Sequence, residues 1–238
     1  MNSYTRRLWK LAALALAVAA QGAFAQGTVT ISGVVYAFNT PYPVGGATVS
    51  VAEYPEISTV SDAAGHYSLT VPDDALVTPV ASLDGYFHTE YLQTFETDGG
   101  NITNAHFQFI PEFVYQFLAG MLGVDPNACH IASTVSVAAL HTATWEQLMA
   151  FGPQGEVGAT VTSSPAVPGP IYFDEQTLPN PYLTSTTNDG GILYINLPAG
   201  LYRISAHHPD HKFAKFTATC APGRFINASP SWGLWEKQ

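Results

Sequence analysis

Three imidazoles and one carboxylate stand within five residues near the end of the sequence, at His207, His208, Asp210 and His211. Imidazole nitrogens and carboxylate oxygens are ligands of zinc and copper, so this run could hold a transition metal. On a strand only alternate residues share a face, so His207 and His208 reach one ion only if a turn reorients one of them. A solvated turn is therefore the alternative interpretation. Two other histidines could complete a ligand set, His130 and His141.

Aromatic side chains in the second half of the chain form another candidate site, one for stacking on a carbohydrate. The stretch 163–184 contains five prolines, and stiff loops that present aromatic rings are often used to bind ligands. The tail 227–235 adds two indoles. In the alternative, the loop rings close the end of a sandwich and the indoles fold back onto the second domain. The candidate ligand-binding residues are Tyr172, Phe173, Tyr182, Trp232 and Trp235.

Motifs of common enzyme classes are missing from the sequence. It contains no G-x-S-x-G elbow and no H-E-x-x-H motif, so the local geometry of serine hydrolases and zincins is not supplied. The two cysteines do not form a C-x-x-C pair, which disfavours a redox role. The sequence thus predicts a non-catalytic protein without a cofactor. A metal-dependent enzyme that uses the histidine run stays the alternative.

The elements that would position these side chains are strands. Residues 48–51 and 66–71 alternate polar and apolar side chains, which is the period of strands with one buried face. Between them, Asp62-Ala63-Ala64-Gly65 has the composition of a tight turn. Pro72 ends the second strand because it cannot donate to a ladder.

A looser copy of this unit follows later in the chain. Residues 46–50 correspond to 158–162 at a constant offset of 112, and residues 62–72 correspond to 188–198 at an offset of 126. The difference predicts a 14-residue insertion within 163–184. We therefore expect a duplicated unit with one enlarged loop.

Gly-Ala-Thr-Val at 46–49, followed by Ser-Asp-x-x-Gly-x-Tyr-x-Leu-x-Val-Pro at 61–72, resembles the carboxypeptidase regulatory-like domain. The resemblance covers residues 27–110 and, more weakly, 128–235, where Asn188 and Leu193 replace the Asp and the Tyr. It implies a seven-stranded, transthyretin-like antiparallel sandwich, similar also to the B-type repeats of surface adhesins. It implies no catalytic residue, because the family's usual role is that of an accessory, binding or stabilising module.

Two short helices interrupt the strands. Apolar residues at helical spacing predict a helix over 113–122, ended by Gly123 and Pro126. We expect it to buttress the two domains, with docking of a partner as the alternative. A capping box, Thr144-Trp145-Glu146-Gln147, predicts a second helix that ends at Gly152-Pro153.

The only two cysteines, Cys129 and Cys220, favour one disulfide between the first and a late strand of the second sandwich, because an exported chain meets an oxidising compartment. On the chain-entropy account, closing so long a loop contributes about 4 to 5 kcal/mol.

The N-terminus has the composition of an export signal. Basic residues precede an apolar run that is too short to span a bilayer, and Ala23-Phe24-Ala25 fits a cleavage site, so residues 1–25 resemble a signal peptide. Arg6 and Arg7 partly resemble a twin-arginine signal, which leaves the export route open. We expect a periplasmic or secreted protein without a membrane span.

Beyond residue 25 the chain carries five basic and eighteen acidic residues, a formal charge of −13. Residues 26–202 contain no Lys or Arg. Nucleic acid is therefore a poor partner, because its phosphates need clustered basic side chains.

Together these observations predict an all-β protein of two tandem transthyretin-like or Ig-like antiparallel β-sandwiches with short connecting helices. The expected order is a signal peptide at 1–25, a carboxypeptidase regulatory-like sandwich at 26–110, a helical linker at 111–127 and a disulfide-linked sandwich at 128–238. The predicted function is that of an exported module for binding, adhesion or envelope accessory work, with a polysaccharide or an envelope protein as partner. Metal binding and carbohydrate binding remain the alternatives.

Overall fold

A computed structural model describes residues 27–85, 88–152 and 154–238, and the predicted signal peptide lies outside the described residues. The chain folds as an all-β protein of two halves. In the first half, β1 (Thr28–Ala37) is the centre of a short sheet. It pairs antiparallel with β4 (His66–Pro72) and parallel with β9 (Phe107–Phe109).

A second layer of the first half faces this short sheet. Its strands are β2 (Thr48–Val51), β3 (Tyr54–Val60), β6 (Pro79–Ser82) and β7 (Glu90–Tyr91). A two-stranded ribbon of β5 (Leu76–Val77) and β8 (Phe95–Glu96) lies beside them. The core between the layers comes from alternating side chains, such as Tyr67, Leu69 and Val71 of β4, as their period predicts.

The second half is built around β10 (Cys129–Ser136). This strand pairs antiparallel with β14 (Gly191–Leu197) and parallel with β17 (Phe225–Ala228) and β18 (Leu234–Trp235). Beyond β14 lie β12 (Ile171–Phe173) and β13 (Pro179–Asn180). The facing sheet contains β11 (Thr160–Ser164), β15 (Gly200–His207) and β16 (Lys215–Cys220).

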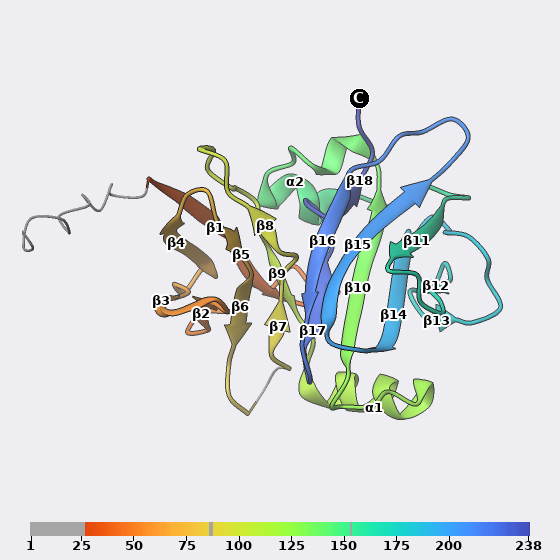
Figure 1. Cartoon of the computed structure of the whole chain (residues 1–238), viewed down its shortest axis with the longest axis horizontal. Helices are drawn as coiled ribbons and strands as arrows, with labels where there is room; N and C mark the ends of the chain where they lie inside the picture. Colours follow the sequence, from red (N-terminus) through yellow and green to blue (C-terminus); the bar gives the residue numbers. More distant parts are fainter. Residues whose placement is uncertain (1–26, 86–87, 153) are drawn as a thin grey trace, which may run out of the picture.

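One long sheet runs through both halves. β17 of the second half pairs in parallel with β7 of the first, through Ile226 and Tyr91. The result is a ten-stranded sheet that both halves share (Figure 1). In each half this long sheet forms one of the two layers. Each half therefore keeps one short sheet of its own, β4-β1-β9 or β11-β15-β16.

The duplicated unit is visible in the hydrogen bonds. The amide of Gly46 donates to the carbonyl of Ser61 and that of Gly158 to the carbonyl of Thr186, each at 2.9 Å. Gly46 and Gly158 share a positive φ, 83° and 86°, which explains glycine at both positions. The 112-residue offset of the first run is therefore confirmed.

The offset of 126 predicted between residues 62–72 and 188–198 is wrong at the turn that precedes β4 and β14. Ser61 and Thr186 are 125 residues apart, one less than predicted. The extra residue lies further along β14, because Cys129 faces Leu197 whereas Ile131 faces Tyr194. This bulge contains Asn196 at a φ of 57°. The insertion is thus one residue shorter than predicted, and the bulge restores the offset of 126 at Leu197.

Two helices agree with the sequence. α1 (Glu112–Leu122) ends at Gly123 in the left-handed conformation, and α2 (Trp145–Ala150) has the predicted capping box. A short 3₁₀ turn, η1 (Ala138–Leu140), precedes α2. Among the described residues no helix has both the length and the apolar character needed to cross a membrane.

Residues 76–82 and 90–96 each form two short strands rather than one long strand. At Thr78 the chain leaves the ladder, because its amide donates to Glu53 Oε2 at 2.7 Å and its hydroxyl bonds to the Thr94 hydroxyl at 2.9 Å. The first stretch therefore splits into β5 and β6, and the second into β7 and β8.

Candidate functional site

The histidine run lies at the end of β15 and in the loop that follows. The ring of His207 hydrogen-bonds to Thr162 on the neighbouring strand, and His208 Nδ1 accepts the amide of Asp210 at 3.2 Å. The rings of His208 and His211 lie 4.7 Å apart. The structure thus brings His208 and His211 together, whereas His207 is paired with β11.

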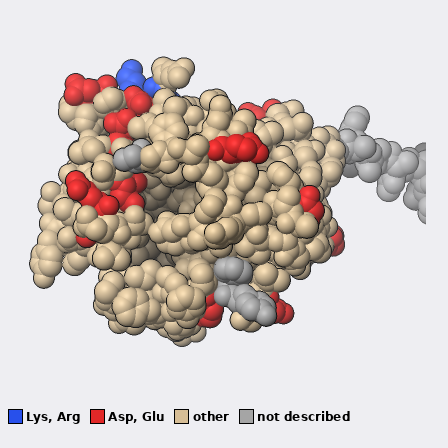
Figure 2. Space-filling view, turned by 180° about the vertical axis from the view of Figure 1, so that it is seen from behind, with Lys and Arg blue, Asp and Glu red and all other residues tan. Residues whose placement is uncertain are grey.

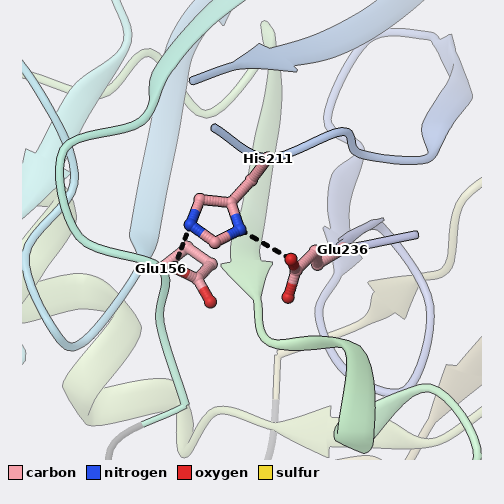
Figure 3. A group of neighbouring side chains, drawn as sticks. All are labelled: Glu156, His211 and Glu236. Atoms are coloured by element: carbon pink, nitrogen blue, oxygen red, sulfur yellow. Dashed lines mark hydrogen bonds and ion pairs between the residues drawn. The ribbon is translucent and has the colours of Figure 1, made fainter. Parts of the chain in front are cut away.

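His211 lies between two carboxylates from distant segments (Figure 3). Its Nδ1 is 2.6 Å from Glu236 Oε1, and its Nε2 is 3.9 Å from Glu156 Oε2. The hydrogen bond to Glu236, with further attraction from Glu156, raises the pKa of His211. The group forms a possible metal-binding cluster. One ligand atom from each of the three residues lies within 4.8 Å of the others, so the group offers three ligands, one fewer than structural zinc sites use.

The two further histidines are engaged elsewhere. His130 is buried, with Nε2 3.0 Å from the Asp125 carbonyl and Nδ1 accepting the Asn196 amide at 3.2 Å. Burial lowers the pKa of His130. His141 hydrogen-bonds to the Ser231 carbonyl. Neither belongs to the metal-binding cluster found among the described residues.

The predicted aromatic residues are spread over several surroundings. Tyr172 is buried, with its hydroxyl accepting the Val161 amide, whereas Tyr182 is 92% exposed. Trp235 stacks on His141 at 3.8 Å. Phe173 lines a groove described below.

The expectation that both indoles fold back onto the second domain is wrong for Trp232. Its ring packs on the core of the first half, edge-on to Phe95 at 5.2 Å, and its Nε1 donates to the Thr103 carbonyl at 2.8 Å. The tail therefore ties the two halves together.

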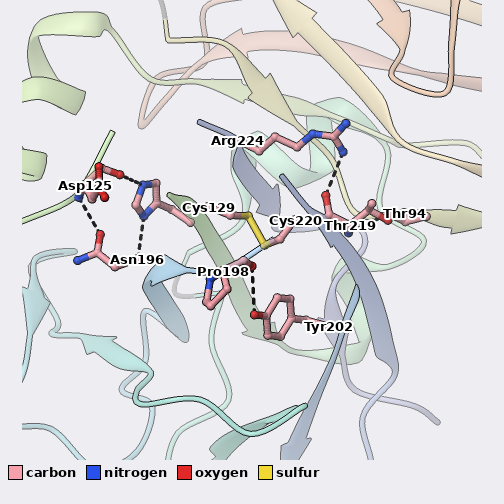
Figure 4. Close-up of a disulfide and its surroundings, with 10 residues drawn as sticks. Thr94, Asp125, Cys129, Asn196, Pro198, Tyr202, Thr219, Cys220 and Arg224 are labelled. Atoms are coloured by element: carbon pink, nitrogen blue, oxygen red, sulfur yellow. Dashed lines mark hydrogen bonds between the residues drawn. A yellow bond between two sulfur atoms is a disulfide. The ribbon is translucent and has the colours of Figure 1, made fainter. Parts of the chain in front are cut away.

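The predicted disulfide is confirmed between Cys129 on β10 and Cys220 on β16 (Figure 4). It links the two layers of the second half. Around it, Thr219 meets Thr94 of the first half through their hydroxyls at 2.7 Å. The disulfide indicates an extracytoplasmic protein, because such bonds persist in oxidising compartments.

A groove lies on the rear of the long sheet, the side turned away from the viewer in Figure 1 and shown in Figure 2. Its floor is the outer face of β10, β14 and β17, and β9 of the first half supplies part of its wall. The short sheet of the second half packs against the opposite face, over Ile131 and Ile192. Neither short sheet therefore covers this part of the long sheet.

Helix α1 covers one end of the groove without packing along its whole length. None of its described residues is buried. At its start, Tyr115 stacks on His88 with ring centroids 3.5 Å apart, and Glu112 hydrogen-bonds to the same histidine at 3.0 Å. Just beyond its end, Asn196 donates to the Gly123 carbonyl at 3.0 Å. The helix is thus held at both ends, and space remains beneath its middle.

The inner part of the groove is an apolar cavity of about 160 Å³. Its floor includes Ala132, Leu193 and Ile195, and the inner side of α1 contributes Leu118 and Leu122. Engineered apolar cavities of about this size hold a benzene molecule. The inner cavity can therefore take a ring or a short alkyl chain.

The outer part of the groove is more polar and larger, about 410 Å³. It is bounded by the end of α2 and by the loop after β12, with Glu175 among its lining residues. Residues common to both parts show that they lie side by side. The shared lining residues are Asn39, Gln108, Gln154, Thr177 and Asp189.

Asp189 stands where the two parts meet. One carboxylate oxygen accepts the Gly191 amide at 2.9 Å, and the side chain also bonds to Thr177. Burial raises the pKa of this carboxyl, and Asp174 adds to the effect. Lys and Arg are missing from the groove lining. Figure 2 shows a hollow in this face with acidic side chains on its left rim.

A buried carboxyl, Glu90, lies behind the groove wall at the junction of the halves. One oxygen accepts the amide of Gln108 at 2.9 Å, and the carboxyl also bonds to the side chain of Asn227. Its other oxygen has no hydrogen-bond partner among the described residues. Burial raises the pKa of Glu90 to about 8, so this carboxyl is mostly protonated at neutral pH.

The groove was not predicted from the sequence, although β14 carries a signal. Its residues 191–197 are apolar on both faces, whereas β4 alternates strictly. The predicted offset of 126 hides this difference between β14 and β4, because it matches Leu193 with Tyr67, whose side chain lies in the core. In the observed register Leu193 corresponds to Ser68, on the outer face.

The sequence matches no protein-family profile and no curated protein. Similar solved structures include the TIE protein of Bacillus anthracis, at 14% identity and a TM-score of 0.30 over 88% of this chain and 34% of that one. This chain thus spans about a third of that protein. The minor pilin GBS52 of Streptococcus agalactiae gives 8% identity and 0.29 over 88% and 97%, and the shaft pilin SpaA of Lactobacillus rhamnosus GG gives 11% and 0.26 over 88% and 97%. These scores assign neither a family nor a function.

Proposed function

We propose that this protein is an exported, non-catalytic binding module that holds an apolar ligand in the groove beneath α1. It acts in the periplasm or outside the cell, and each half is one carboxypeptidase regulatory-like unit. The proposal rests on one observation, the apolar side chains of Ala132, Leu193 and Ile195 on the outer face of β10 and β14, which lie under a helix that does not fill the space below it.

The comparison with the first half supports this proposal. In the shared register, Ala132 corresponds to Ser32, Leu193 to Ser68 and Ile195 to Thr70. At these three positions the first half has polar side chains where the second half has apolar ones, whereas at Thr134 the groove is polar and the first half has Val34. Leaving apolar surface open to water costs about 25 cal/mol per Å². An open apolar floor at one copy alone is accounted for by a ligand that covers it.

The aromatic residues proposed for carbohydrate stacking support that alternative less well. A carbohydrate platform needs exposed rings in one plane, yet Tyr172 is buried and Trp232 packs on the first half. The inner groove, in contrast, combines apolar side chains with polar ones on several elements, among them His130, Thr134, Asp189 and Asn227, as small-molecule sites do.

The test uses a neutral probe of suitable size, 4-phenylbutan-1-ol, followed by saturation-transfer NMR. With about eleven non-hydrogen atoms, we expect a Kd of about 0.1 to 1 mM. Ala132→Phe fills the floor and should abolish binding. Ser32→Phe, the matched change in the first half, should leave binding unchanged.

Circular dichroism and thermal unfolding confirm that both variants are folded. A second pair, Leu193→Trp and Ser68→Trp, repeats the test should Ala132→Phe be unstable. Equal binding by groove variants and controls, or no binding by the wild type, would contradict the proposed function.

A further inference from the structure

We propose that the groove selects an apolar cation, an amine whose hydrocarbon part fills the cavity beneath α1 and whose ammonium group pairs with Asp189. This inference rests on the proposed function and adds the chemical class of the ligand. It follows from the charge, the position and the partners of Asp189.

The position of Asp189 is that of an anchor at the mouth of an apolar cavity. It lines both the inner and the outer part of the groove. A ligand in the inner part can therefore place its polar end beside this carboxylate. The lining of the inner cavity also includes Leu118, near the middle of α1, and Leu122, at its end.

The charge of Asp189 is not balanced by the protein. Its side chain accepts hydrogen bonds from the Gly191 amide and from Thr177, which carry no charge. The ion pairs among the described residues all involve histidine, at His88 and His211, and none includes Asp189. Asp174 and Glu175, the nearby acids, add negative charge rather than balance it. A positively charged ligand would supply the charged partner that Asp189 lacks among the described residues.

Burial strengthens the expected pairing. A half-buried carboxylate is held at a cost, which is why burial raises the pKa of Asp189. An ammonium group placed beside it removes that cost, since charged hydrogen bonds are about twice as strong as neutral ones. Four aromatic rings also line the inner cavity, and their faces attract cations. These rings belong to Phe38, Tyr115, Phe173 and Phe225.

The same features disfavour other apolar ligands. A fatty acid or another apolar anion would place a second negative charge beside Asp189, with no Lys or Arg in the lining to receive it. A neutral ligand can fill the cavity but leaves the carboxylate unpaired. We therefore expect the order amine, alcohol, carboxylate in affinity.

Three probes with the same hydrocarbon part test this order at pH 7.5. They are 4-phenylbutylamine, 4-phenylbutan-1-ol and 4-phenylbutanoate, each titrated against the full chain beyond residue 25 by calorimetry or by NMR. The amine should bind at least about tenfold more tightly than the alcohol, given the strength of a charged hydrogen bond. The carboxylate should bind more weakly than the alcohol.

Asp189→Asn should remove the preference for the amine and leave alcohol binding within about twofold, since the two side chains have the same shape. Asp62→Asn is the matched control, because Asp62 is the carboxylate of the corresponding turn in the first half, where it accepts the amides of Ala64 and His66. This variant should keep the preference.

The two proposals fail in different ways. Equal affinity for amine and alcohol in the wild type, or a preference that survives Asp189→Asn, would overturn the cation inference while the groove remains a binding site. If no probe binds, or if Ala132→Phe binds the probes as the wild type does, the proposed function fails and the inference fails with it.

Discussion

The outer faces of two equivalent sheets, β1 with β4 and β10 with β14, have opposite characters. Apart from the bulge in β14, both pairs have the same register, and both bury similar apolar side chains on their inner faces. Outside, Ser68 and Thr70 of β4 are exposed, whereas Leu193 and Ile195 of β14 line a groove under α1. The two halves thus share the core pattern of these strands, while the outer face of the second half lines the groove in which we propose that a ligand binds.

Two features of the second half have no counterpart among the described residues of the first half. The disulfide ties β10 to β16, where the first half has Val29 in place of Cys129 in the shared register. The bulge in β14 projects Asn196 toward the end of α1. The predictions below test whether these features, and the junction between the halves, have the roles that the comparison assigns to them.

The largest effect is expected from the disulfide. Replacing both Cys129 and Cys220 by Ala should lower the free energy of unfolding by about 4 to 5 kcal/mol, because the bond closes a loop with a sequence separation of 91 residues. Urea denaturation measures the change. Hydrogen exchange should speed up in β10, β14 and β16 while β1 and β4 keep their protection. An unchanged denaturation midpoint would contradict this role.

Glu90 should give a stability that depends on pH. Its pKa of about 8 in the folded state lies above the ordinary value of 4.5. The protonated form is favoured by folding, so this stabilisation is complete below about pH 4.5 and is lost as the pH rises through 8. Glu90→Gln should abolish this loss and stabilise the protein at pH 9 by on the order of a few kcal/mol. Urea titrations at pH 5 and pH 9 measure it.

Two tyrosines near Glu90 must be considered when the pH dependence of stability is interpreted. Tyr36 and Tyr67 are close enough to Glu90 to interact with it. Burial, and to a smaller extent the charge of Glu90, raises the pKa of Tyr36. Both phenols stay neutral across this range. An unaltered pH dependence in Glu90→Gln would assign the effect to another group.

Asn196 should have a smaller effect, one specific to α1. Asn196→Gly keeps the positive φ but removes the amide contacts with Gly123 and Asp125, at 3.0 and 2.7 Å. We expect a loss of about 1 to 2 kcal/mol and faster hydrogen exchange at the end of α1. Asn104→Gly, a control at a similar φ of 56° in the first half, should leave α1 unchanged. Equal exchange of α1 in both variants would contradict the role of the bulge.

Much of the fold could be predicted because local chemistry determines it. The alternation in β4, the capping box at Thr144 and the glycine after α1 each have one structural interpretation, and the structure agrees. The shared long sheet could not be predicted, because it depends on a single pair between β7 and β17 that no local pattern marks.

The groove could not be predicted from the sequence for a related reason. Its floor depends on the register of β14, and a bulge shifts that register by one residue. A shift of one residue exchanges the two faces of a strand, so Leu193 was assigned to the core. The candidate residues chosen by chemical type, such as His207 and Trp232, are instead held by local partners.

Methyl NMR is the most direct test of the central claim that one sheet face of the second half binds a ligand. The protein would be labelled at Ala, Leu and Ile methyl groups and titrated with 4-phenylbutylamine. Shifts should be largest at Ala132, Leu193 and Ile195, while Ile31 and Leu69 in the core of the first half stay unchanged. Shifts confined to other methyl groups, or none at saturating ligand, would contradict the account.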